Sequence, residues 1–169
     1  MIRGYIIYSR CDKSKLIEKE SRGIGDRIST KRNYMFLSIL PNEQENTIEK
    51  YLNRGTMFAL VDDEVKAECV VTDEDGRILE FKNIAPIPDS QRRGFSRALL
   101  HFLENWYKNR YRILQIGTGD SPLIIIFYQK CGFVDSYKVK SFFVDNYDHP
   151  IIECDDQLVD MVYLQKSLE

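Results

Sequence analysis

The sequence predicts a mixed α/β (α+β) domain whose sheet is mostly antiparallel and contains one parallel crossover. From Thr56 to Ala85, apolar and polar residues alternate in three runs that acidic turn segments separate, as in an antiparallel meander. A long amphipathic helix and then a buried strand follow. Because the order strand, helix, strand implies a parallel crossover, these observations together predict the mixed sheet.

Three strands make up the predicted meander, and their period-two alternation assigns side chains to opposite faces. In the third strand, Glu80 therefore lies on the face opposite to Phe81, together with Lys82 and Ile84. The three strands, which the turn sequences DDE and DEDG separate, are residues 56–61, 64–72 and 77–85.

The region before the meander gives weaker signals. YIIY near the start indicates a short strand, and residues 42–55 have the acidic start, helical spacing and final glycine of a helix. Residues 12–30 show only weak helical periodicity. Residues 34–40, YMFLSIL, fit either a strand or a buried turn of helix, and both alternatives stay open.

The long helix after the meander has apolar residues at helical spacing from Phe95 to Trp106. Asp89 or Ser90 is expected to cap its start. Residues 112–117, RILQIG, then indicate the buried strand that completes the crossover.

The sequence SPLIIIFYQKCGF fits two structures. Ser121 as N-cap, Pro122 in the first turn and Gly132 after the last turn favour a helix, whereas three consecutive isoleucines favour a strand. Because signals at both ends agree, a helix is predicted. The tail holds two predicted strands and an acidic loop between them, at residues 139–144, 160–168 and 145–156.

Composition and charge narrow the possible functions. The 169 residues, 43% hydrophobic and 30% charged, fit a single globular domain spanning 1–169. A net charge of −2 argues against nucleic acid as a partner, and the longest apolar run, LIIIFY, is too short for a membrane span. The start lacks the features of a signal peptide, so a cytoplasmic location is expected. The cysteines are too scattered to predict a metal site: Cys11, Cys69, Cys131 and Cys154.

Adjacent arginines at the start of the long helix point to an anionic ligand. Each cation there loses about 0.3–1 kcal/mol against the helix dipole, yet Arg92, Arg93 and Arg97 all lie at this end. A phosphate reverses the penalty, because the free N–H groups of the helix start and the guanidinium groups both attract it. Gly94 lets the backbone approach such a ligand, and Ser96 adds a hydroxyl donor. The alternative is a solvated basic face; the Walker and Rossmann glycine patterns are absent.

The segment QRRGFS, Gln91 to Ser96, resembles the Q/R-x-x-G-x-G/A loop of the GNAT N-acetyltransferases. LEFKNIAPIP and FYQKCGF match two further segments of that family, and the resemblance runs from about Thr56 to Phe133. It implies helices on both faces of the sheet and acetyl-CoA as the co-substrate, without a metal. Ser96 departs from the pattern, because the family prefers glycine or alanine there, and this implies a slightly crowded loop.

The resemblance also implies how acetyl-CoA is bound. In the family, the loop wraps the pyrophosphate, and the strand before the loop bonds to the pantetheine arm. A backbone N–H of that strand, at Ile84 or Ala85, would donate to the thioester oxygen as that oxygen gains charge. The residues implied in cofactor binding are Ile84, Ala85, Pro86, Gln91, Arg92, Arg93, Gly94, Phe95, Ser96 and Arg97.

Three residues are candidates for catalysis. Tyr128 matches the tyrosine that the family often uses as the general acid toward the leaving thiolate; the alternative is a core tyrosine packed with Phe127. Glu80 is the first candidate for the general base, because it lies on the strand that the family often uses for this role. Glu68 is the second. Either glutamate has the alternative of a solvated strand residue paired with a lysine.

The implied activity is an acetyl-CoA-dependent transfer of an acetyl group to a primary amine by direct attack in a ternary complex, with a homodimer as one option. If the acidic loop 145–156 borders the site, it favours a cationic amine; a solvated hairpin is the alternative. Two other functions stay open. One is a non-catalytic acyl-CoA-binding sensor or interaction module of the same fold, and the other is a nucleotide-phosphate enzyme of a different fold.

Overall fold

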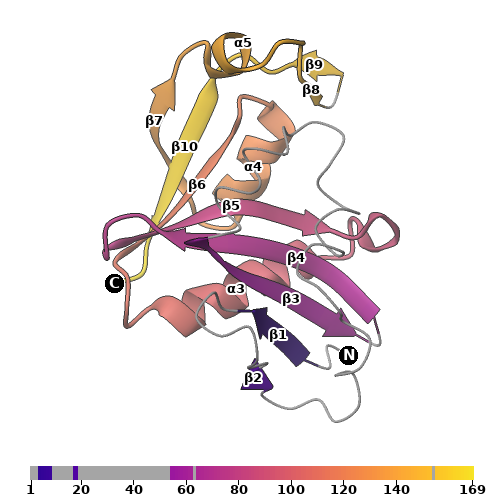
Figure 1. The fold of residues 1–169 in the computed structure, drawn as a ribbon, viewed down its shortest axis with the longest axis vertical. Helices are drawn as coiled ribbons and strands as arrows, with labels where there is room; N and C mark the ends of the chain where they lie inside the picture. Colours follow the sequence, from indigo (N-terminus) through magenta and orange to yellow (C-terminus); the bar gives the residue numbers. More distant parts are fainter. Residues whose placement is uncertain (1–3, 9–16, 19–53, 63, 154) are drawn as a thin grey trace. The chain divides into compact units, whose positions relative to one another are not determined.

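The computed structural model describes residues 4–8, 17–18, 54–62, 64–153 and 155–169 (Figure 1). The chain divides into two compact units. The first unit comprises Met1–Asp73 and Phe81–Trp106, and the second comprises Glu74–Glu80 and Tyr107–Glu169. Strand β5 (Ile78–Pro86) begins in the second unit and ends in the first. The single domain expected for residues 1–169 stays a prediction.

The first unit contains a β-sheet built on the predicted meander. Its strands are β1 (Gly4–Tyr8), β2 (Ile17–Glu18), β3 (Thr56–Asp62), β4 (Glu64–Asp73) and the second half of β5. They lie in the order β2-β1-β3-β4-β5. The pairs β1–β2, β1–β3 and β3–β4 are antiparallel. Both the meander and the strand at YIIY are therefore confirmed.

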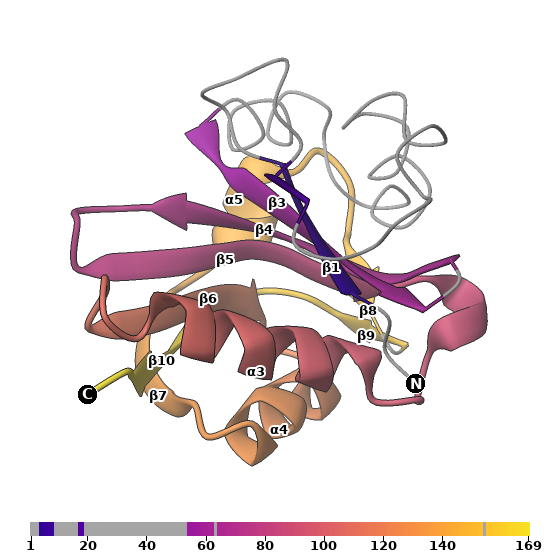
Figure 2. The same cartoon turned by 90° about the horizontal axis from the view of Figure 1, so that it is seen from below.

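Helix α3 (Phe95–Tyr107) packs along the strands of the first unit (Figure 2). The ring of Phe102 meets that of Phe58 on β3 edge to face, with 6.2 Å between centroids, and Trp106 stacks on Phe102 at 5.6 Å. The leucines at helical spacing are buried: Leu99, Leu100 and Leu103. The predicted amphipathic helix is confirmed, since its apolar stripe is the side that contributes to the core.

The second unit contains β6 (Ile113–Gly119), β10 (Met161–Ser167) and β7 (Val134–Val139), side by side in that order and antiparallel (Figure 1). The start of β5 lies next to β6. There the carbonyl oxygen of Arg77 accepts hydrogen bonds from the backbone nitrogens of Arg112 (2.9 Å) and Ile113 (3.2 Å). Helix α3 connects β5 to β6, and the predicted mixed fold, mostly antiparallel with one parallel pair, is confirmed.

Helix α4 (Pro122–Lys130) settles the ambiguity of the segment with three isoleucines. Pro122 begins the helix, and Gly132 beyond its end has φ +90°, a left-handed conformation that suits glycine and stops a helix. Ser121 occupies the N-cap position, but its hydroxyl makes no capping hydrogen bond in the described structure. Proline and glycine therefore fix the two ends of α4.

The strand predicted at residues 139–144 is wrong. Helix α5 (Phe142–Asn146) lies there, because its turn buries Phe143 with Ile151 and Leu158. The ring of Tyr147, the residue after the helix, stacks on Phe143 at 5.7 Å. The strand of this region comes earlier, as β7. The acidic loop contains a two-stranded hairpin, β8 (Ile152–Glu153) and β9 (Asp156–Gln157).

The predicted cap of the long helix is also wrong. Asp89 and Ser90 belong to a separate 3-10 helix, η1 (Pro88–Ser90), and α3 begins only at Phe95. Pro86 before η1 and Pro88 at its first position disfavour the α conformation in the residues that precede them, so the chain does not enter the long helix directly. Ile17–Glu18 form β2 within the segment 12–30. The rest of that segment, residues 34–40 and residues 42–53 of the predicted helix lie outside the described residues.

Within the described ranges, every helix is too short or too polar to span a membrane.

Candidate functional site

The turn that enters α3 in the first unit begins where β5 ends. The backbone nitrogen of Ile87 still donates to the carbonyl oxygen of Lys66 on β4 (2.9 Å), so pairing with β4 continues to this residue. Ser90 then donates to the carbonyl oxygen of Ile87 (2.7 Å) and closes η1. The chain is thus tied to the sheet directly before the segment Gln91–Arg97.

Two residues of this segment have positive φ angles. Arg92 has φ +59° and Gly94 has φ +84°. A left-handed conformation costs a residue such as arginine roughly 1–2 kcal/mol, and strain of this kind is often kept at binding sites. A Cβ at Gly94 would meet open space, so its φ angle, rather than crowding, is what requires glycine. Alternating backbone conformations of this sort turn successive N–H groups toward one concave surface.

The amide groups at the start of α3 point toward the same region. The first hydrogen bond of the helix runs from Ala98 to the carbonyl oxygen of Gly94 (3.0 Å). The N–H groups of Phe95, Ser96 and Arg97 therefore precede the helical ladder and have no acceptor within it. Three exposed arginines surround these donors: Arg92, Arg93 and Arg97.

The segment thus combines backbone donors, the positive end of a helix dipole and guanidinium groups, which together suit a phosphate or diphosphate. Arg93 lies over the ring of Phe95, with 5.2 Å between its Cζ and the ring centroid. This contact holds the guanidinium group of Arg93 next to the turn. The cofactor-binding residues predicted at Gln91–Arg97 are brought together here, and the strand residues Ile84, Ala85 and Pro86 lie half-buried immediately before them.

Glu80, the first candidate for the general base, lies on β5 within the second unit and is 6% exposed. Its Oε2 accepts a hydrogen bond from Nε2 of Gln115 on β6 (2.8 Å). Gln115 in turn accepts from Nε2 of Gln165 on β10 (2.7 Å). Three neighbouring strands therefore hold the carboxylate in place. Sequence reasoning missed Gln115, although a polar residue inside the buried run RILQIG is a detectable signal.

Glu68, the second candidate, lies on β4 in the first unit and is 2% exposed. It neighbours the thiol of Cys69, whose pKa is raised by burial first and by the charge of Glu68 to a lesser degree. A thiol with a raised pKa is not an activated nucleophile. The interpretation of either glutamate as a solvated strand residue is wrong, because both side chains are buried.

Tyr128 lies in the last turns of α4 in the second unit and is 6% exposed. Its ring meets those of Phe127 (5.1 Å) and Phe133 (5.9 Å) edge to face. It therefore has the packing expected of the core alternative. The same packing would hold a phenol in one orientation, and its role as the acid stays a prediction.

Two further tyrosines form a stack on the sheet of the second unit. Tyr163 of β10 and Tyr137 of β7 are paired in register, and their rings are 4.4 Å apart with 12° between their planes. Burial and the charge of Glu80 raise the pKa of Tyr163 to about 12. The same two causes raise the pKa of Tyr137, against a hydrogen bond from Gln115 that lowers it. Nothing in the local sequence around either tyrosine predicts this arrangement.

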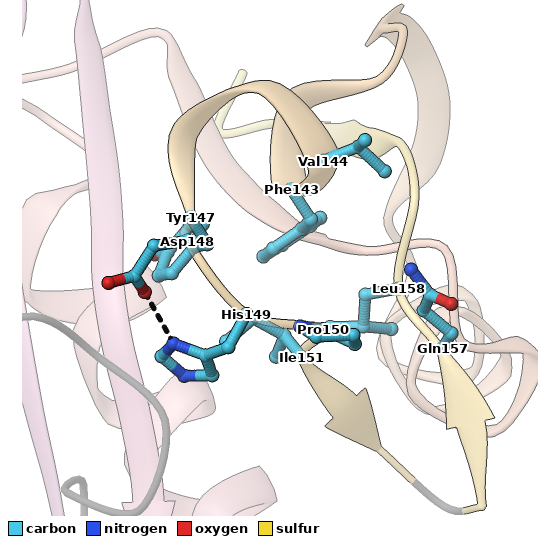
Figure 3. A pocket seen from close by; sticks show the side chains of 9 residues that line it. All are labelled: Phe143, Val144, Tyr147, Asp148, His149, Pro150, Ile151, Gln157 and Leu158. Carbon is cyan, nitrogen blue, oxygen red and sulfur yellow. Dashed lines mark hydrogen bonds and ion pairs between the residues drawn. The ribbon is translucent and has the colours of Figure 1, made fainter.

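The acidic loop of the second unit surrounds a cavity of about 160 Å³ (Figure 3). Phe143, Ile151 and Leu158 form its apolar wall, and Asp148 and His149 lie at its rim. Nδ1 of His149 donates to Oδ1 of Asp148 (2.6 Å), and this hydrogen bond with the charge of His149 lowers the pKa of Asp148. Both side chains are largely exposed. The loop therefore lines a pocket, and its expected contact with an acceptor stays a prediction.

His101 lies on the exposed side of α3. Among the described residues, no group of histidine, cysteine, aspartate and glutamate is arranged to hold a metal ion.

Comparisons with known proteins agree with this fold. A family model described as an acetyltransferase (GNAT) domain matches residues 53–135. A GNAT family acetyltransferase from Elizabethkingia anophelis, solved with acetyl-CoA bound, is 32% identical; the match covers 82% of this chain and 92% of that one, with a TM-score of 0.75. A Bacillus subtilis acetyltransferase in complex with CoA is 30% identical over 79% of this chain and 88% of its own, with a TM-score of 0.70. No curated protein sequence matches the chain.

Proposed function

Because the chain belongs to the GNAT family of acetyltransferases, we propose that it transfers the acetyl group of acetyl-CoA to a primary amine, by direct attack in a ternary complex. The observation that carries this proposal is the turn Gln91–Arg97, where positive φ angles, amide donors and arginines meet at one helix start. Acetyl-CoA is the acyl donor in the proposal, since relatives that are 32% and 30% identical were solved with acetyl-CoA or CoA bound.

The turn fits the diphosphate of the coenzyme on chemical grounds. N–H groups from Phe95 to Arg97 donate to phosphate oxygens, and Arg92 and Arg93 balance the two negative charges. Each hydrogen bond to a charged group contributes roughly 1.5–3 kcal/mol. Ile84 or Ala85 supplies a backbone N–H for the thioester oxygen, on which negative charge develops during attack.

The reacting amine must lose a proton before its nitrogen can attack. An alkylamine with a pKa of about 10.4 is neutral in roughly one molecule in 2,500 at pH 7, which corresponds to about 4–5 kcal/mol. In the proposal Glu80 accepts this proton, and the hydrogen bond from Gln115 keeps the carboxylate in position. Glu68 is the second candidate for this role.

In the proposal, bond formation and bond cleavage follow. The amine nitrogen bonds to the carbonyl carbon, the carbon–sulfur bond breaks, and the thiolate takes a proton from Tyr128, which regains one from solvent. The proton on Glu80 and the second proton of the attacking nitrogen both leave to solvent, and Tyr128 takes one proton back, so the overall reaction of the ammonium form releases the amide, CoA and one proton. The phenol suits this role because its ordinary pKa of about 10 lies near that of a thiol. The cytoplasmic location and the homodimer stay predictions.

Transfer of a labelled acetyl group from acetyl-CoA to a panel of primary amines tests the proposal. Wild-type protein is expected to acetylate at least one amine, and Tyr128→Phe is expected to lower kcat about 10²-fold with little change in the Kd of acetyl-CoA. Acetyl-CoA binding without turnover of any amine would instead support the sensor or interaction module. Failure of CoA to bind at all would remove both functions.

A further inference from the structure

The sheet of the second unit gathers polar and aromatic side chains on one face. Gln115 faces Gln165 and Gly117 faces Tyr163 across β6 and β10, and Tyr163 faces Tyr137 across β10 and β7. Residues opposite each other or two apart share a face. The tyrosine–carboxylate cluster is defined here as Glu80, Gln115, Tyr137 and Tyr163.

Gly117 makes room for this cluster. A Cβ at that position would come within 2.9 Å of Cε1 of Tyr163 and within 3.1 Å of its Cζ. The ring of Tyr163 therefore lies directly over β6, on the side toward β5 and Glu80. Tyr137, which stacks on its other side, remains 47% exposed, so solvent and solutes reach the stack.

The charges around the stack are negative. Burial first, and then the charges of Glu80 and Glu74, raise the pKa values of Tyr137 and Tyr163 above the ordinary value of about 10, so both phenols are neutral at pH 7. A neutral phenol ring has a negative π face, which attracts a cation within about 6 Å. A buried carboxylate beside an aromatic stack is thus a surface that favours an ammonium group over a neutral or anionic one.

We infer that the tyrosine–carboxylate cluster is the acceptor-binding surface and that it selects a cationic alkylamine. This rests on the proposed function, in which Glu80 receives the proton of that amine. The exposed ring of Tyr137, which Tyr163 holds in place by stacking, contacts the ammonium group. Gln115 is a positioning residue that fixes the carboxylate through its 2.8 Å hydrogen bond. The pocket of the acidic loop is a weaker candidate, because the Asp148–His149 pair at its rim is largely exposed to solvent.

A matched pair of small probes tests the inference on the intact, CoA-bound protein. Butylamine and O-propylhydroxylamine have the same chain length, but only butylamine is charged at pH 7. Titration by NMR or calorimetry is expected to show butylamine binding at least tenfold more tightly. In Tyr163→Leu this preference is expected to fall to about twofold, while Tyr163→Phe, which keeps the ring, retains it.

The control is Tyr111→Leu, which removes a ring from the Tyr107–Tyr111 pair elsewhere in the second unit. It should leave the preference unchanged. A second variant, Gln115→Leu, should lower kcat about tenfold at saturating amine and shift the pH dependence of kcat. Gln115→Asn, which keeps an amide donor on a shorter side chain, should recover part of the rate.

Equal binding of the two probes to wild-type protein, absence of binding included, overturns the inference, as does a preference that survives in Tyr163→Leu. The proposed function is judged separately by turnover of labelled acetyl-CoA. Selective binding of butylamine without turnover would remove the proposed function and leave the inference standing. Turnover of an amine without a binding preference for the charged probe would support the proposed function and overturn the inference.

Discussion

The turn Gln91–Arg97 and the tyrosine–carboxylate cluster are built in opposite ways. The turn is one short, exposed segment that would bind the coenzyme, in the proposed function, through its backbone angles and charges. The cluster takes its side chains from β5, β6, β7 and β10. A local segment can be recognised from its residues, whereas a cluster assembled from four strands depends on strand pairing. In our two proposals, the turn binds the coenzyme and the cluster binds the acceptor.

Glu80→Gln should give the largest effect. The replacement keeps the size of the side chain but removes the proton acceptor, so kcat/KM should fall about 10²–10⁴-fold. The Kd of acetyl-CoA, measured by calorimetry, should stay within twofold, because the turn is untouched. Glu104→Gln on α3 serves as the control. A larger loss of kcat/KM in Glu68→Gln than in Glu80→Gln would show that Glu68 on β4, rather than Glu80, is the general base.

Gly94→Asp should weaken acetyl-CoA binding about 100-fold, because it places a carboxylate among the phosphate donors and forces a side chain to adopt φ +84°. Gly76→Asp is a matched control, since Gly76 has φ +76° in the β4–β5 hairpin and also open space around it. Gly94→Asn introduces a side chain of the same size without the charge, so it should weaken acetyl-CoA binding less than Gly94→Asp does. Unchanged affinity of Gly94→Asp for acetyl-CoA would show that the turn does not bind the coenzyme.

Arg93→Ala should raise the Kd of acetyl-CoA about fivefold, because an exposed charge contributes roughly 1 kcal/mol or less. The difference from wild type should shrink as salt is raised, since exposed charges are screened. The control is Arg110→Ala, which removes another arginine that lies over an aromatic ring, that of Tyr107. A salt-independent loss would mean that Arg93 acts through packing on Phe95.

The smallest effect concerns stability at high pH. The pKa of Tyr163 is raised to about 12 in the folded protein, so the unfolded chain releases this proton first, at its ordinary pKa of about 10. The associated stability is complete below pH 10 and is lost between about pH 10 and 12. The free energy of unfolding of Tyr163→Phe, measured by urea denaturation, should therefore fall less steeply over this interval than that of wild type. Equal slopes would contradict the raised pKa of Tyr163, which burial and then the charge of Glu80 cause.

The sequence predicts the turn better than the cluster. Arg92, Arg93 and Gly94 stand next to each other, so their chemistry is visible without a fold, although the positive φ of Arg92 is not. Glu80 is visible as a polar residue in a strand, but its contact with Gln115 spans 35 residues and needs the β5–β6 pairing. The stack of Tyr137 on Tyr163 needs β7, which the sequence interpretation missed because it assigned the strand to residues 139–144 instead.

The left-handed backbone of Arg92 limits how this protein can be improved. Glycine or asparagine adopts that conformation more readily, so a search for heat-resistant variants should find Arg92→Gly or Arg92→Asn early. Either replacement also takes a cation away from the start of α3. Selection for thermal tolerance alone would thus drift toward weaker coenzyme retention, and only a combined screen would keep the arginine.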